Sequence, residues 1–380
     1  MTHISDLFPE KGKLVLTGSG REFIEQLGVK TARDVVLAVL RGENIREHTE
    51  PLTRRRLAIA TGAMVSLFTQ GWHEVDDFTN KLSQMALDQM NVTSKSNKAI
   101  MWPAQWLIGL TGKSIQNVLR SNLETREQYI KDFELAVEES ARKCEADFGP
   151  ISMTLGFVET QGEVKPLGWK DITRLTTAIG SATLTIRGSE KATYGKLFER
   201  LVLGSVLTIL GFEYVESSAS SPIEKVFWLS DSSDNRECDA TVRLRAGKLA
   251  RFDIGFIGKG NPEVMKDKLS RYANEVEQHG KQMTSKTFVI VDRMPQTPKT
   301  LDAAKKAGSE IIQMSMKFWP QELAKKMKLQ LGHESEILNV SEDALSDYLA
   351  TKINLIPILN FLNKNGGIDD TLESTELLDE

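Results

Sequence analysis

The hydrophobic pattern of the chain changes near residue 185, and this change constrains the fold more than any other feature. Up to about residue 150, apolar residues recur at the 3- and 4-residue spacing of helices. Beyond residue 185, one helix is followed by short strands and then by alternating helices and strands. This order is typical of a mixed β-sheet flanked by helices. We therefore predict an α/β (α+β) core behind a large helical N-terminal domain.

The individual elements follow from local patterns. The first core helix is expected to begin near Ser189 and to stop at Gly211. The predicted strands lie at 212–216, 226–230, 238–245, 249–257, 287–293 and 310–315. The other main predicted helices lie at 31–42, 55–71, 126–146, 262–279, 298–308 and 319–330. Gly42 and Gly71 stand where the first two of these should end.

These patterns divide the chain into five expected parts. They are a helical domain at 1–150, a connector at 151–184, the core at 185–330, a helical extension at 331–366 and a tail at 367–380. The tail carries six acids and no base, so we predict that it is disordered.

Composition excludes several classes of protein. The 48 basic and 52 acidic residues give a net charge of −4, so any phosphate-binding surface must come from local basic residues. Two distant cysteines favour neither a disulfide scaffold nor a zinc site. The chain has no signal peptide pattern and no apolar run of 18 residues, which predicts a cytoplasmic protein without a membrane span.

Two aspartates stand out in the segment 238–257, which predicts a β-hairpin turning at 246–248. Strand alternation sets Asp239 and Asp253 apart from their apolar neighbours, and the turn can bring them together. A carboxylate inside so apolar a strand is costly unless something compensates its charge, and a divalent cation is one such compensation. The alternatives are solvated strand residues, or a salt bridge to Arg243 or Arg251.

Glu199 offers a third carboxylate, at the edge of the apolar stripe of the helix before the strands. It could reach the end of a sheet against which that helix packs. The alternative is a surface residue paired with Lys196. Together, such carboxylates could hold Mg²⁺, which assists phosphodiester hydrolysis by activating water and neutralising charge.

Nuclease sites of this kind usually carry a lysine two residues after the second acid, but Gly255 stands there. Lys268 is the favoured substitute, because a helix after the strand would turn back and bring it level with Asp253. A solvated helix face is the alternative for Lys268. Other candidate lysines are Lys259, Lys191 and Lys196.

Several segments together resemble the PD-(D/E)xK nuclease superfamily and, more closely, the CfrBI family of restriction endonucleases. They are RGSEKATYGKLFERLVLGSVLTILGF (187–212), KVFWLS (225–230), RECDATVRLR (236–245), RFDIGFIGKGN (251–261) and IIQMSMKFWP (311–320), with softer matches at 53–58 and 106–120. The resemblance implies a type II enzyme, acting as a homodimer, that cuts both strands of a short palindromic site in double-stranded DNA with Mg²⁺. It also implies that Asp239 and Asp253 are metal ligands and Glu199 an auxiliary one. Cys238 and Gly255 depart from the family pattern and leave a DNA-binding protein with an inactive core as an alternative. A structure-specific repair nuclease of the same superfamily is a further alternative.

DNA recognition needs arginine and lysine at phosphates and base edges. The candidates are Arg54, Arg55, Arg56, Arg236 and Arg271. A solvated, salt-bridged helix end is the alternative for the first three. We predict no nucleotide cofactor, because the P-loop-like segment at 110–114 has Leu107 in place of the required glycine.

Overall fold

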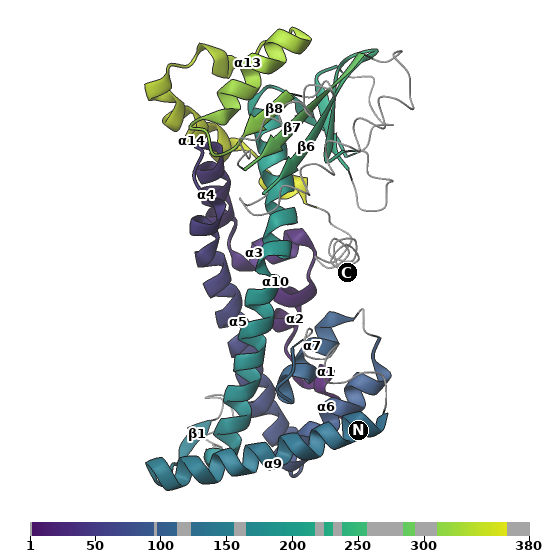
Figure 1. Ribbon diagram of the computed structural model, residues 1–380, viewed down its shortest axis with the longest axis vertical. Coiled ribbons are helices and arrows are strands. Elements are labelled where there is room, and N and C mark those ends of the chain that lie inside the picture. The colour runs from purple at the N-terminus through teal and green to yellow at the C-terminus, as the bar shows by residue number, and fades with distance from the viewer. Residues whose placement is uncertain are drawn as a thin grey trace, which may run out of the picture. The chain divides into compact units, whose positions relative to one another are not determined.

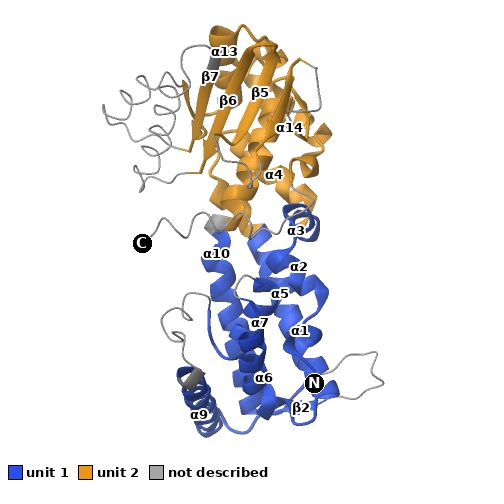
Figure 2. Cartoon of the chain, turned by 90° about the vertical axis from the view of Figure 1, so that its right-hand side faces the viewer, with its two compact units in different colours: residues 1–27, 52–191 blue, residues 28–51, 192–380 orange. Residues whose placement is uncertain are grey.

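The computed structural model describes residues 2–94, 97–111, 123–155, 165–216, 224–230, 238–256, 284–292 and 310–362. Contacts divide the chain into two compact units, shown in Figure 2. Unit 1 comprises Met1–Leu27 and Leu52–Lys191, and unit 2 comprises Gly28–Pro51 and Ala192–Glu380. The expected five-part division, drawn with other boundaries, stays a prediction. Its acidic tail lies outside the described residues.

Unit 1 is mainly helical (Figure 1). It contains α1 (Ile4–Leu7), α2 (Glu10–Thr17), α3 (Gly20–Leu27), most of α5 (Ile45–Glu74), α6 (Phe78–Val92), α7 (Lys98–Leu107), α9 (Leu123–Phe148), and the antiparallel pair β1 (Met153–Leu155) and β2 (Lys165–Leu167). Its core is rich in large buried side chains, among them Phe8, Phe68, Phe78 and Trp106. The predicted helical N-terminal region is thereby confirmed. Among the described residues, no helix is long and apolar enough to cross a membrane.

Gly71 does not end its helix, contrary to the prediction, because α5 continues to Glu74. A Cβ at position 71 would lie 2.3 Å from the ring of Phe78. The glycine is therefore a close-packing residue rather than a cap. Gly42, by contrast, adopts a φ of 91° just after α4 (Val29–Leu40), as a helix-ending glycine does.

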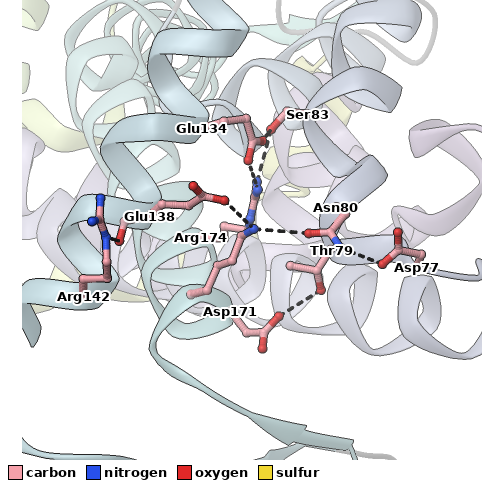
Figure 3. Close-up of polar contacts among 10 residues, drawn as sticks. Asp77, Thr79, Asn80, Ser83, Glu134, Glu138, Arg142, Asp171 and Arg174 are labelled. Atoms are coloured by element: carbon pink, nitrogen blue, oxygen red, sulfur yellow. Dashed lines mark hydrogen bonds and ion pairs between the residues drawn. The ribbon is translucent and has the colours of Figure 1, made fainter. Parts of the chain in front are cut away.

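A polar network joins three helices of unit 1, and Figure 3 shows its residues. The side chain of Arg174 on α10 (Trp169–Ile209) is fully buried and forms an ion pair with Glu134 on α9. It also donates to the hydroxyl of Ser83 on α6 at 3.2 Å. Nearby, Thr79 donates to Asp171 at 2.9 Å. Charged side chains therefore fix the mutual packing of α6, α9 and the first part of α10.

Unit 2 is built on a six-stranded mixed sheet in the order β3-β4-β5-β6-β7-β8. The strands are β3 (Glu213–Tyr214), β4 (Val226–Leu229), β5 (Ala240–Arg245), β6 (Lys248–Gly255), β7 (Thr284–Val291) and β8 (Glu310–Gln313). Strands β4, β5 and β6 pair antiparallel, whereas β3–β4, β6–β7 and β7–β8 pair parallel. The sheet confirms the predicted mixed α/β core and its strand positions. The predicted helices at 262–279 and 298–308 lie outside the described residues.

The helix before the sheet begins earlier than predicted. Helix α10 starts at Trp169 rather than near Ser189 and runs for 41 residues. The segment predicted as a connector carries Ile172, Leu175, Ala178 and Ala182 at helical spacing, and the last three are buried. Tertiary packing of this apolar stripe outweighs the helix-breaking tendency of Gly180, which lies within it.

The C-terminal part packs on the sheet and on α10 through buried aromatic residues. It contains α13 (Trp319–Leu331), the 3₁₀ turns η2 (Glu336–Asn339) and η3 (Glu342–Ala344), α14 (Leu345–Leu355) and η4 (Ile358–Phe361). The ring of Phe361 lies 5.3 Å from that of Tyr214 and 6.1 Å from that of Phe227. It also lies against Gly204 of α10, where a Cβ would come within 2.6 Å of the ring. Phe361 therefore ties the C-terminal segment to both layers.

Candidate active site at the β5–β6 edge

Asp239 and Asp253 lie on neighbouring strands. The antiparallel register pairs Ala240 with Phe252 and Thr241 with Arg251. One further step along this register sets Asp239, the residue before β5, opposite Asp253. The two strands are joined by a turn that contains Gly247, whose φ of 72° is the left-handed conformation that glycine adopts without strain, and a register irregularity between Arg243 and Arg245 sets the final pairing.

The backbone and side chain of Asp239 are held by both neighbouring strands. Its amide donates to the carbonyl of Phe252 at 2.9 Å, and its carbonyl accepts from the amide of Ser230 at 3.0 Å. Its Oδ2 accepts a hydrogen bond from the amide of Ile254 at 2.8 Å. The carboxylate is therefore fixed beside the residue that follows Asp253.

Asp253 lies in the interior of β6, which has β5 on one side and β7 on the other. Only 8% of the residue is exposed, and both its sequence neighbours, Phe252 and Ile254, are apolar and fully buried. Phe252 points to the opposite face, where its ring stacks on Phe288 at 5.1 Å. A carboxylate placed this deeply in a sheet is costly unless charge or hydrogen bonds compensate it.

The pKa of the Cys238 thiol is raised by its surroundings, which include both carboxylates. Burial raises its pKa most, and the nearby charges of Asp239 and Asp253 raise it further. A hydrogen bond with Thr241 and the charge of Arg251 oppose this change. The charges of Asp239, Asp253 and Arg251 are therefore all close to the buried Cys238 thiol, at the end of β6 and the start of β5.

Glu199 lies partly buried on the helix that faces this edge. The next residue, Arg200, donates from Nη1 to the carbonyl of Ser230 at 2.6 Å. Since Ser230 also bonds Asp239, the helical turn that carries Glu199 lies beside the start of β5. Arg200 could not be predicted from the sequence, because its partners are backbone carbonyls distant along the chain.

The candidate lysines are described only in part. Lys268 and Lys259 lie outside the described residues, and the side chain of Lys191 is likewise not described. Lys196 is partly buried on α10, three residues before Glu199. Gly255 is buried at the end of β6, two residues beyond Asp253.

The candidate DNA-contacting arginines of α5 occupy different environments. Arg54 and Arg55 are exposed, and Arg55 donates to the carbonyl of Leu27 at 2.5 Å. Arg56 is only 1% exposed. Its guanidinium bonds the carbonyl of Val15 at 3.0 Å, reaches the hydroxyl of Ser189 and lies over the ring of Phe23. These contacts make Arg56 a packing residue of unit 1. Arg236 and Arg271 lie outside the described residues.

The donor set at this edge suits a hard divalent cation. Within the described ranges, no three His, Cys, Asp or Glu side chains are arranged to hold a metal ion, so Glu199 does not complete a three-carboxylate group with Asp239 and Asp253. Mg²⁺ is commonly held by one or two carboxylates, with water and substrate phosphate completing its shell. Asp239 and Asp253 therefore fit this ion, with Glu199 on the adjacent helical turn.

Comparison with known proteins covers almost the whole chain. The family model of the CfrBI restriction endonuclease matches residues 29–299. The type II restriction enzyme CfrBI of Citrobacter freundii is 33% identical over 388 residues, which span 97% of this chain and 96% of that enzyme. No solved structure matches the chain. The matched family range includes Glu199, Asp239 and Asp253.

Proposed function

Because this chain belongs to the CfrBI restriction endonuclease family, we propose that it hydrolyses both strands of double-stranded DNA at a short palindromic site in a Mg²⁺-dependent reaction. Family membership makes the chain a restriction nuclease that acts on DNA. The metal, the symmetry of the site and a PD-(D/E)xK-type centre are parts of the proposal. The observation that carries it is the juxtaposition of Asp239 with the buried Asp253 across β5 and β6.

Each residue has a definite task in this proposal. Asp253 and Asp239 hold Mg²⁺, and the amide of Ile254 orients the Asp239 carboxylate through its 2.8 Å hydrogen bond. Bound Mg²⁺ would supply positive charge that offsets the phosphate charge and acidifies a nearby water. Glu199 is an auxiliary carboxylate. Lys268 would orient the attacking water and stabilise the charge that develops on the phosphate.

DNA is held by basic residues from several parts of the chain. We assign phosphate and base contacts to Arg54, Arg55, Arg236 and Arg271, and the exposure of the first two supports this assignment. Arg56, the remaining candidate of this run, is buried and would contribute indirectly, because its hydrogen bond to Val15 holds α5 in position within unit 1. A palindrome is cut on both strands most simply by a homodimer, because each copy then meets one half-site.

Plasmid digestion tests the proposal. Purified protein and Mg²⁺ should give discrete fragments whose sequenced ends share one motif. Asp253→Ala should abolish cleavage and retain a gel shift with the same DNA. Undiminished cutting by that variant would remove Asp253 from the site.

A second candidate function is DNA binding without cleavage. Gly255 favours it, because the usual lysine position beside Asp253 has no side chain. In that case the plasmid remains intact at every Mg²⁺ concentration while the gel shift persists. A structure-specific repair nuclease, the third possibility, would cut without a common end sequence.

A further inference from the structure

Arg200 connects three elements that meet at the proposed site. It lies on α10 directly after Glu199 and is partly buried. Its Nε donates to the carbonyl of Phe361 at 2.9 Å, and its Nη1 donates to the carbonyl of Ser230 at 2.6 Å. One guanidinium thus joins the helix, the end of β4 and the C-terminal turn η4.

Ser230 links Arg200 to Asp239, one of the two proposed metal ligands. Its amide donates to the carbonyl of Asp239, whose carboxylate accepts from the amide of Ile254. A continuous chain of hydrogen bonds therefore runs from Arg200 through Ser230 and Asp239 to the strand that carries Asp253. Bonds from a charged guanidinium are stronger than those between neutral groups, so the first link is a firm one.

We propose that Arg200 is a positioning residue that sets Asp239 at the spacing from Asp253 required to hold the divalent cation. This inference rests on the proposed function. The planar guanidinium directs its N–H groups in a fixed fork, so its two carbonyl contacts fix the direction of approach of α10. An ammonium group has no such fork. We therefore expect Arg200→Lys to restore only part of the effect.

Arg33 provides a matched control. Its guanidinium also donates to two carbonyls of the C-terminal segment, those of Asn354 and Ile356, at 2.9 Å each. Among the described residues, it makes no hydrogen bond to β4 or β5. A purely structural role for Arg200 predicts that Arg33→Met and Arg200→Met have the same consequences.

The test uses the full chain in three measurements. In the metal-free protein, hydrogen exchange should be faster in Arg200→Met than in wild type for peptides covering Asp239 and Ile254, and unchanged in Arg33→Met. Calorimetric titration with Mn²⁺ should show affinity at least about tenfold weaker in Arg200→Met, with Arg200→Lys between it and wild type. The Mg²⁺ concentration for half-maximal DNA cleavage should rise in parallel.

The outcomes separate this inference from the proposed function. Equal exchange and equal Mn²⁺ affinity in Arg200→Met and Arg33→Met would overturn the positioning role. If Asp239→Asn leaves Mn²⁺ binding unchanged, the proposed metal site itself is wrong. If Arg200→Met does not fold, Arg200→Lys takes its place, and wild-type exchange and affinity in that variant would overturn the role.

Discussion

The carboxylate of Asp239 accepts a 2.8 Å hydrogen bond from the backbone amide of Ile254, so one proposed metal ligand is tied to the residue that follows the other. The bond joins the start of β5 to the end of β6. It holds the carboxylate in place before any cation arrives. Preorganisation of this kind reduces the free energy that ordering the ligand would otherwise cost on binding.

Two substitutions at Asp239 should separate the structural bond from the proposed chemistry. Asn retains a side-chain oxygen for the Ile254 amide, whereas Ala removes this hydrogen bond, and the loss of a buried bond of this kind costs about 1–3 kcal/mol. We expect Asp239→Ala to unfold at lower urea concentration than Asp239→Asn, with DNA cleavage lost in both. Coincident urea transitions would show that the bond contributes nothing to stability.

Mg²⁺ should stabilise the protein through Asp253. A ligand at 100 times its dissociation constant raises the free energy of unfolding by about 2.7 kcal/mol. We expect the wild-type melting temperature to rise with Mg²⁺ and that of Asp253→Asn to stay constant. Glu213→Gln, which neutralises an exposed carboxylate of the same sheet, should retain the wild-type response. A full Mg²⁺ response in Asp253→Asn would place the cation elsewhere.

The hairpin of the site could be predicted from sequence because its determinants are local. Alternation predicts the faces of β5 and β6, and the turn at Gly247 predicts that they pair, but the one-residue register shift between Arg243 and Arg245 that sets Asp239 opposite Asp253 has no signal in the sequence. Two other features could not be predicted. The first half of α10 could not be recognised because Gly180 and Gly188 disfavour a helix in the sequence, and only tertiary packing compensates for them. Arg56 resembles its exposed neighbours in sequence, and its partners Val15 and Ser189 are distant along the chain.

Two glycines of α5 should respond to alanine with opposite signs. At Gly71 a Cβ would lie 2.3 Å from the Phe78 ring, and such overpacking costs about 1–3 kcal/mol. At Gly62 nothing lies within 4 Å of the added Cβ, so Ala should stabilise by up to about 1 kcal/mol through helix propensity. Thermal unfolding of both variants checks this. A stabilising Gly71→Ala would mean that Phe78 moves aside without cost.

His333 should make stability depend on pH. Burial lowers its pKa below the ordinary value of 6.5, although the hydrogen bond with the Leu210 carbonyl opposes this shift. The unfolded state therefore binds more protons than the folded state below about pH 6.5. The free energy of unfolding should therefore keep its full value above that pH. It should fall as the pH drops towards 5.5, because the unfolded state then gains protons that the folded state does not bind.

His333→Gln provides the comparison for this effect. Glutamine can still donate to Leu210, but it does not titrate and it loses the stacking on Phe212. We expect a lower free energy of unfolding at pH 7 and a shallower decrease down to pH 5.5, measured by urea unfolding across this range. Parallel pH dependences in the two proteins would assign the effect to other groups.

The ion pair between Arg174 and Glu134 should give unequal results when either partner is removed. The Arg174 side chain is fully buried, whereas 27% of the Glu134 side chain is exposed. Removing one partner of a buried pair costs about 3–5 kcal/mol, because the remaining charge is uncompensated. Glu134 can be hydrated in part and Arg174 cannot, so Glu134→Leu should destabilise more than Arg174→Met.

The double variant shows whether the pair itself stabilises the fold or whether each charge is needed only to compensate the other. Apolar side chains of similar volume often replace a buried ion pair without loss of stability. We therefore expect Glu134→Leu with Arg174→Met to have a higher free energy of unfolding than Glu134→Leu alone. Urea unfolding of all four proteins gives the coupling energy by a double-mutant cycle. Additive losses would contradict this expectation, because they would show that each side chain is stabilised by its own packing and by Ser83 rather than by the opposite charge.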